Sequence, residues 1–135
     1  MSKRAYYRAL YGEAWKTMDA EKMLSAVADG FVLNDPALPD PVTKATLAAC
    51  LAGWDERMKA AGSTGEMEIS DIVVQDKDGV WVEWNWWSFP GTDIEGAGLL
   101  KITDEGVVSE RVAYYVAPRK LTRMSASGYK QTSRG

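Results

Sequence analysis

Phe31-Val32-Leu33-Asn34-Asp35-Pro36-Ala37-Leu38-Pro39-Asp40-Pro41 is the stretch of sequence that decides the fold. Its three leading apolar residues predict a short strand, and the prolines that follow predict that the strand becomes a stiff loop. A carboxylate at such a strand end can face a cavity, so Asp35 is a candidate functional residue. The alternative is that Asp35 forms a turn by accepting hydrogen bonds from local amides.

The chain has 135 residues, of which 46% are hydrophobic, and this suffices for one globular domain with a continuous core. We place that domain at residues 1–118. All 19 acidic residues precede residue 119, whereas five of the 16 basic residues lie at or after it. Residues 119–135 are therefore predicted to form a basic, flexible tail. The acidic body argues against nucleic acid as a partner.

The sequence contains no histidine, which excludes catalytic triads, histidine-liganded zinc and imidazole acid/base chemistry. The acidic residues are scattered rather than clustered, so we expect no metal and no cofactor. Cys50, the single cysteine, lies in an apolar helical pattern and is expected to pack as a small hydrophobic residue.

Neither a membrane span nor a signal peptide is expected. No apolar run approaches the roughly 20 residues that a spanning helix requires, and the first residues lack the apolar core of a signal peptide. We therefore expect a cytoplasmic protein with no membrane partner.

Three helices are predicted in the first half of the chain. The first runs from a Ser2 cap to about Met18 and turns Tyr11 into the fold. Asp19 caps a short second helix that Gly30 ends.

The third helix is predicted to begin with Asp40 as its cap and Pro41 as its first residue, and to end near Ala61. Its apolar stripe comprises Leu47, Leu51, Trp54 and Met58. Lys44 on this helix is a candidate for binding a phenolate or carboxylate, and the alternative is a solvated helical face.

The second half of the chain changes to a period of two, which predicts strands. Short turns rich in Gly and Asp separate them, so consecutive strands should form antiparallel hairpins. The predicted strands span about 66–75, 79–89, 94–103 and 107–117. Helices followed by a long meander indicate an α+β architecture, in which one curved antiparallel sheet wraps around the helices and encloses a cavity.

This order of elements, with Asp35-Pro36 at the end of the first strand, resembles the NTF2-like superfamily and its SnoaL-like and ketosteroid-isomerase-like enzymes. The resemblance implies a cone of curved sheet closed by three N-terminal helices. In the ketosteroid isomerases a first-helix tyrosine precedes the Asp-Pro by the interval that here separates Tyr11 from Asp35. The tyrosine of those enzymes stabilises an enolate oxygen, and the aspartate shuttles a proton.

By this resemblance Tyr11 is the candidate donor to an oxyanion or leaving group, and Asp35 is the candidate general base. The last strand places Glu110, Val112 and Tyr114 on the cavity side, with Glu110 as a second catalytic carboxyl group. The protonated aspartate of the isomerase oxyanion hole falls near Gly98 and is missing here.

Each assignment has a structural alternative. Tyr11 can be a core ring whose hydroxyl is satisfied, and Glu110 can pair with Arg111 or Lys101 on the outer face of the sheet. If Glu110 and Asp35 do share the cavity, burial and mutual repulsion raise the pKa of one of them, which yields one acid and one base.

Alternate residues of a strand point to opposite faces of the sheet, and tryptophans occur in both alternating sets, or phases, of the strand Val80–Phe89. Both faces of the sheet therefore carry large side chains. The pattern leaves open which phase faces inward. We assign Trp84 and Trp86 to the cavity wall, together with Trp54, because such a wall suits flat aromatic ligands. The other phase, with Trp81 and Trp87, is left for a subunit interface.

These observations predict a cofactor-independent lyase, dehydratase or isomerase that acts on a small apolar, aromatic molecule. The tryptophan-rich wall also resembles superfamily members that release formaldehyde from lignin-derived diarylpropanes. A homodimer or homotrimer through the sheet is expected. The alternative function is a non-catalytic NTF2-like module that binds a small ligand or a protein.

Overall fold

The computed structural model describes residues 1–116, which form three helices and one mixed sheet of six strands. The predicted domain end at 118 and the predicted tail at 119–135 lie outside the described residues. The helices are α1 (Lys3–Thr17), α2 (Ala20–Ala26) and α3 (Leu47–Ala60). The strands are β1 (Val27–Asn34), β2 (Val42–Thr43), β3 (Glu68–Lys77), β4 (Val80–Ser88), β5 (Glu95–Thr103) and β6 (Gly106–Val116).

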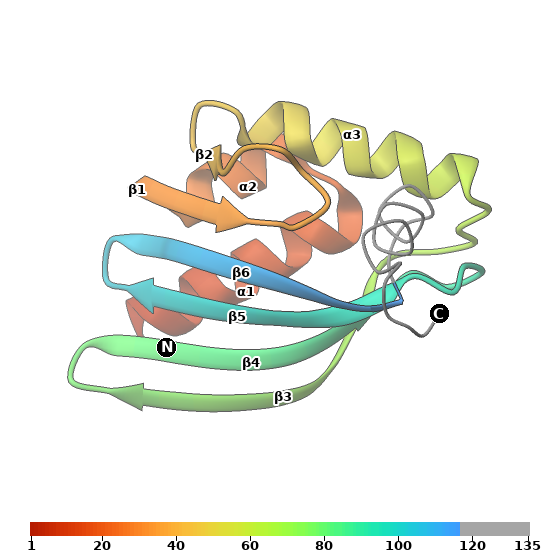
Figure 1. The fold of residues 1–135 in the computed structure, drawn as a ribbon. Helices are drawn as coiled ribbons and strands as arrows, with labels where there is room; N and C mark the ends of the chain where they lie inside the picture. The colour runs from red at the N-terminus through yellow and green to blue at the C-terminus, as the bar shows by residue number, and fades with distance from the viewer. Residues whose placement is uncertain (117–135) are drawn as a thin grey trace, which may run out of the picture.

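The strands lie in the order β2-β1-β6-β5-β4-β3. The four long strands from β3 to β6 are joined by hairpins, as the turn composition predicted, whereas β1 pairs with β6 in parallel. Figure 1 shows the helices against one face of this sheet, with α1 behind β5 and β6. The sheet and helices together form the predicted α+β cone.

The core lies between the helices and the inner face of the sheet. Alternate residues of β5, such as Leu100 and Ile102, point inward and are almost completely buried. From the helices, Tyr11, Ala14 and Leu51 meet them. Each helix thus buries one face, as its period of apolar residues predicted.

The second helix ends earlier than predicted. It ends at Ala26, and Val27 is already in β1, so Gly30 lies inside the strand rather than at a helix end. Val27 pairs with Val107 of β6, and the register shifts before Val32. This parallel pairing joins segments far apart in the chain, and local helix signals carry no information about it.

The predicted start of the third helix was wrong. Asp40 does not cap it; instead Val42 and Thr43 form the short strand β2 against β1, and α3 begins after Thr46. The Thr46 hydroxyl accepts a hydrogen bond from the Thr43 amide, at 3.0 Å. Pairing with β1 thus satisfies backbone groups that the sequence had assigned to a helical turn.

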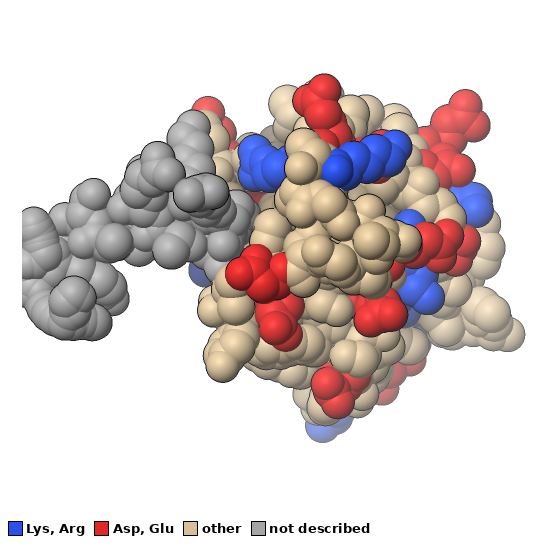
Figure 2. Space-filling model, turned by 90° about the vertical axis from the view of Figure 1, so that its right-hand side faces the viewer, with Lys and Arg blue, Asp and Glu red and all other residues tan. Residues whose placement is uncertain are grey.

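Figure 2 shows the end of the molecule that lies at the right of Figure 1. Acidic and basic side chains are interspersed there among uncharged ones, and no basic surface of the kind that binds nucleic acid is seen on this face. None of the helices in residues 1–116 combines the length and hydropathy that crossing a membrane requires.

Candidate active site

A mostly apolar pocket opens between α1, α3 and the inner face of the sheet. Its cavity volume is about 40 Å³, which is small beside the roughly 300–1,000 Å³ of sites that hold drug-sized ligands. Apolar side chains make most of its wall, and the few polar groups come from α1, β4, β6 and the residue that follows β1. Those polar lining residues are Arg8, Tyr11, Asp35, Asn85 and Glu110.

Tyr11 and Glu110 form the first polar pair of the pocket. The α1 face that is buried against the sheet carries Tyr11, which is 2% exposed, and its hydroxyl donates to Glu110 Oε1. The pKa of the Glu110 carboxyl is raised to about 7, chiefly by burial. The hydrogen bond from Tyr11 lowers this pKa, and the charge of Asp35 raises it. Glu110 is thus poised to hold or release a proton near neutral pH.

Asp35 and Tyr114 form the second polar pair. The Tyr114 hydroxyl donates to Asp35 Oδ1 at 2.7 Å, and the Ala37 amide donates to the same oxygen at 2.9 Å. Burial and the nearby charge of Asp35 raise the pKa of Tyr114, so its phenol keeps its proton. Asp35 therefore both shapes the turn after β1 and lines the pocket. The two predictions for this residue, a turn-forming carboxylate and a carboxylate that faces a cavity, do not exclude each other.

Gly98 makes room for the Glu110 carboxyl. A Cβ atom on Gly98 would lie 2.7 Å from Glu110 Oε2 and 3.1 Å from Asn85 Oδ1. The resemblance to ketosteroid isomerases had placed their missing protonated aspartate at this position. In this chain a carboxyl group from the neighbouring strand β6 fills the space instead.

Arg8 and Glu83 form a charged pair at the end of the pocket nearest β4. Glu83 is completely buried. Its Oε1 accepts hydrogen bonds from Arg8 Nε at 2.6 Å and from Trp81 Nε1 at 3.1 Å. Asn85 Nδ2 donates to its other oxygen at 2.8 Å. Three donors thus satisfy this carboxylate, which is the condition for burying it.

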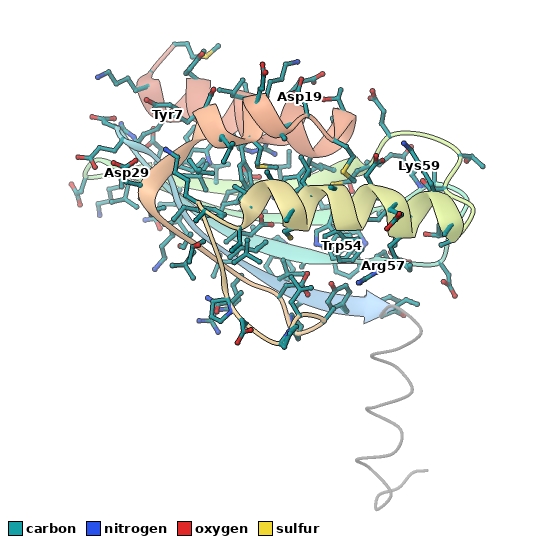
Figure 3. All side chains as sticks on the ribbon, turned by 90° about the horizontal axis from the view of Figure 1, so that it is seen from above. Tyr7, Asp19, Asp29, Trp54, Arg57 and Lys59 are labelled. Carbon is teal, nitrogen blue, oxygen red and sulfur yellow. The ribbon has the colours of Figure 1, made fainter. Side chains whose placement is uncertain are left out.

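Aromatic rings pack around Tyr114, whose hydroxyl donates to Asp35, and form part of the pocket wall there. Trp54 of α3 stacks on Phe89 with ring centroids 5.7 Å apart, and on Tyr114 at 6.4 Å. Trp87 meets Tyr114 edge to face at 5.5 Å. Figure 3 shows Trp54 beside Arg57 on α3, and the Arg57 guanidinium lies 5.3 Å from the Trp54 ring.

The assignment of Trp84 and Trp86 to the pocket was wrong. Trp84 is 46% exposed and lies on the outer face, as does Trp86, whose indole donates to Glu95 at 2.8 Å. The inward phase of β4 is the other one, with Asn85 and Trp87. The physical reason is the buried charge network of Glu83, which requires Arg8 from α1 and therefore turns that phase inward.

Lys44 was also misplaced. It lies between β2 and α3 and pairs with Asp29 at 3.2 Å. Figure 3 shows Asp29 at the left edge of the molecule, away from Trp54 under α3. The remaining predicted substrate-binding residues, Trp54 and Val112, line the pocket, and Tyr114 contacts it through Asp35.

Sequence reasoning missed Arg8, Trp15 and Asn85, which all line the pocket. Arg8 and Trp15 precede and follow Tyr11 by three and four residues, so helical spacing was a signal for both. Asn85 belongs to the same set of alternating residues as Trp81 and Trp87, which was predicted to form a subunit interface.

Cys50 is partly buried, and burial raises the pKa of its thiol to about 11, which agrees with its expected role as a small packing residue. Within residues 1–116, no group of three or more His, Cys, Asp or Glu side chains is arranged to hold a metal ion.

Comparison with known families supports this architecture. The sequence profile of the SnoaL-like domain matches residues 7–110. The chain belongs to the SnoaL-like family. A search of curated proteins finds no match for this SnoaL-like chain.

Solved structures share the fold of this SnoaL-like protein at low sequence identity. An NTF2-like protein from Cytophaga hutchinsonii is 16% identical, with a TM-score of 0.62 over 82% of this chain and 93% of that one. A candidate ketosteroid isomerase from Kribbella flavida is 12% identical, with a TM-score of 0.57 over 87% and 80%. A candidate polyketide cyclase from Xanthomonas campestris is 20% identical, with a TM-score of 0.52 over 86% and 93%.

Proposed function

We propose that this SnoaL-like protein is a cofactor-independent acid/base enzyme acting on a small, largely apolar, aromatic molecule. One observation carries the proposal: two carboxyl groups, each hydrogen-bonded to a tyrosine, face the same apolar pocket. Enzymes that move protons on carbon need an acid and a base in one water-poor site. The structural relatives that are named as a candidate isomerase and a candidate cyclase agree with this class.

In this proposal Asp35 is the general base and Glu110 is the general acid. Asp35 accepts hydrogen bonds from the Tyr114 hydroxyl and the Ala37 amide, whereas Glu110 has a pKa of about 7, raised chiefly by burial. Two carboxyl groups with different environments can take opposite roles in one reaction. Tyr11 donates to Glu110 and so holds that carboxyl group in place.

The proposed substrate is flat and neutral. Trp54, Trp87 and Phe89 provide ring faces and edges for an aromatic group. Among residues 1–116, Arg8 is the one cationic side chain that lines the pocket, and it is paired with Glu83 rather than placed to balance a charged substrate group. We therefore favour phenols, aryl ketones or their ethers over carboxylic acids.

The test measures proton exchange rather than a guessed product. Aryl ketones and 1,3-diketones are incubated with the protein in D₂O, and deuterium uptake at the carbon next to the carbonyl is followed by NMR. We expect exchange with the wild-type protein, and a loss of about 100-fold or more in Asp35→Asn. Normal exchange in folded Asp35→Asn would show that Asp35 is not the base.

Within this class we propose deformylation of a lignin-derived diarylpropane as a specific reaction. A carboxylic acid helps the benzylic hydroxyl leave as water, and the para-phenol forms a quinone methide. A base then takes the proton of the terminal hydroxyl, the carbon-carbon bond breaks to release formaldehyde, and its electrons restore the phenol and form a stilbene. Formaldehyde assays and stilbene absorbance test this reaction, and absence of both products across a panel of such dimers would exclude it.

A binding module is the second candidate function. It is favoured by the fact that Tyr11, Glu110, Tyr114 and Asp35 satisfy each other without a ligand. Thermal-shift screening with aromatic ligands, followed by mass analysis for conversion, separates the candidates. Stabilisation without conversion or exchange favours binding.

We also propose that two or three copies associate through the outer face of the sheet. Val73, Trp84 and Leu99 are opposite one another on adjacent strands, and Tyr115 packs against Trp86 on the same face. These apolar side chains are unusually exposed: Val73 66%, Trp84 46%, Leu99 37% and Tyr115 74%. The cytoplasm is the compartment proposed for this assembly, because the single cysteine offers no intrachain disulfide.

A further inference from the structure

Asn85, Gly98 and Val112 are paired across the inner face of the sheet, one on each of β4, β5 and β6. Gly98 has no side chain, and a Cβ atom on it would lie 2.7 Å from Glu110 Oε2 and 3.1 Å from Asn85 Oδ1. Asn85 and Glu110 both line the pocket. Two side-chain oxygens from different strands thus come close to one position that Gly98 leaves open.

Hydrogen bonding fixes which atom of the Asn85 amide lies beside Gly98. Asn85 Nδ2 donates to Glu83 Oε2 at 2.8 Å, and an ionised carboxylate such as Glu83 can only accept. The carbonyl oxygen is therefore the atom of the amide that remains for the Gly98 position. An amide oxygen accepts hydrogen bonds and cannot donate them, so the partner of Asn85 Oδ1 must be a donor.

Both oxygens can be reached by a molecule in the pocket. Among residues 1–116, no side chain or amide donates to Asn85 Oδ1 or Glu110 Oε2, since Tyr11 donates to the other oxygen of Glu110. The same residues contain no side-chain oxygen that is both fully buried and without a hydrogen-bond partner. Asn85 Oδ1 and Glu110 Oε2 are therefore not sealed inside the protein.

A hydroxyl group has the hydrogen-bonding capacity that this pair of oxygens requires. Its O–H can donate to Asn85 Oδ1, and its oxygen can accept from a protonated Glu110 carboxyl. The Glu110 proton belongs on Oε2, because Oε1 accepts from Tyr11, and a pKa of about 7 keeps part of the protein protonated at neutral pH. An ether or ketone oxygen offers Asn85 no donor.

We propose that Asn85 and Glu110 form a subsite that binds an alcohol hydroxyl next to the aromatic ring of a neutral ligand. This inference rests on the proposed function and names a group that the substrate of the pocket carries. Trp87 follows Asn85 by two residues on β4, so its ring lies beside the subsite on the same face of the sheet. Phe89 meets Trp87 edge to face and stacks on Trp54, which extends the aromatic wall.

The first experiment observes the Asn85 carbonyl in the wild-type protein. The chain has two asparagines, Asn34 and Asn85, so ¹³C labelling of asparagine gives two side-chain carbonyl signals, which Asn34→Ser assigns. Benzyl alcohol and ethylbenzene have nearly the same shape, but only benzyl alcohol carries a hydroxyl. We expect benzyl alcohol to move the Asn85 signal downfield and ethylbenzene not to do so. Asn34 does not line this pocket, and its signal should stay in place with both.

The second experiment compares affinities. We expect Asn85→Leu to lower the preference for benzyl alcohol over ethylbenzene by roughly 3- to 10-fold, the effect of one lost hydrogen bond. The preference for benzyl methyl ether over ethylbenzene should not change, because an ether has no donor for Asn85. Val112→Ala is the matched control, since Val112 flanks Gly98 on the other side and should change all three affinities together. Should Asn85→Leu not fold, the titration of the wild-type protein decides.

The outcomes separate this inference from the proposed function. A downfield shift of the Asn85 carbonyl with benzyl alcohol, without deuterium exchange in any ketone, supports the hydroxyl subsite and contradicts the enzyme. Deuterium exchange together with an unmoved Asn85 signal overturns the subsite and leaves the enzyme standing. Failure of the wild-type protein to bind benzyl alcohol up to its solubility limit also overturns the subsite, as does an unchanged preference in folded Asn85→Leu.

Discussion

Gly98 has no side chain, and this leaves room for the Glu110 carboxyl group on the neighbouring strand. The prediction is that Gly98→Ala displaces the Glu110 carboxyl, because the new Cβ would lie 2.7 Å from its Oε2. Overpacking of this kind typically costs about 1–3 kcal/mol. Thermal and urea unfolding measure the loss, and the deuterium-exchange rate should fall with it.

Gly53→Ala is the matched control for this substitution. Gly53 lies in α3, and nothing stands within 4 Å of the position its Cβ would take. Alanine there should stabilise the helix by about 0.5–1 kcal/mol. Equal stability changes in the two variants would contradict a tight fit at Gly98.

The raised pKa of Glu110 predicts that its contribution to the free energy of unfolding falls as the pH rises toward 7. Its pKa is raised from 4.5 to about 7 in the folded protein, mainly by burial, so between these values the folded state binds more protons than the unfolded state. The contribution of Glu110 to the free energy of unfolding is therefore complete below about pH 4.5 and is lost as the pH rises through 7. Glu110→Gln does not titrate and should escape this loss.

We expect the stability of Glu110→Gln relative to wild type to rise by about 2–3 kcal/mol between pH 5 and pH 8. Urea unfolding at both pH values provides the measurement. Glu105→Gln, on the exposed turn before β6, is the control and should show no comparable change. Parallel profiles for Glu110→Gln and wild type would exclude a buried acid.

At the scale of elements, the Arg8–Glu83 pair ties α1 to β4. We predict that Arg8→Met destabilises the fold by about 3–5 kcal/mol, because it leaves the fully buried Glu83 carboxylate without its cation. Adding Glu83→Gln should restore most of this loss, since a neutral amide needs no counterion. Urea unfolding of the single and double variants measures the coupling between the two residues.

The surface pair Lys59–Asp55 is the control for this element contact. It spans one turn of α3 at 3.0 Å, and the Lys59 side chain is 73% exposed. Lys59→Ala should change stability by less than about 0.5 kcal/mol. A loss as small as this in Arg8→Met would show that the α1–β4 contact does not depend on charge.

Some helices and strands are specified by neighbouring residues in the sequence, and others depend on pairing with a distant segment. The hairpins from β3 to β6 follow from turn residues and period-two patterns, and sequence reasoning located them within a few residues. The first residues of β1 were missed because they pair with β6, far away in the chain, and β2 was missed because its two residues are too few to show a period. The misplaced start of α3 is a consequence of the missed strand β2.

At the scale of the whole molecule, the exposed apolar side chains on the outer face of the sheet lead us to predict self-association. Trp84→Glu places a charge at the centre of the exposed apolar face, next to Val73 and Leu99. If this face is the interface, size-exclusion chromatography with light scattering should show a smaller assembly for the variant than for wild type. Asp78→Ser, on the β3–β4 turn, should leave the assembly unchanged.

A wild-type protein that is monomeric at high concentration would contradict the proposed interface. So would a Trp84→Glu variant that is folded and keeps the wild-type mass. Circular dichroism and thermal unfolding of the variant separate loss of association from loss of fold.

The sequence by itself determined the fold class and the hairpins, because periodicity and turn chemistry are local properties of the chain, and its resemblance to the NTF2-like superfamily indicated Tyr11, Asp35 and Glu110. Only the tertiary structure decided which face of the tryptophan-rich strand points inward. Alternation defines two faces but does not say which is buried, and the choice follows from Arg8, which reaches Glu83 across 75 residues of sequence. The tight space at Gly98 likewise exists only once separate segments are packed together.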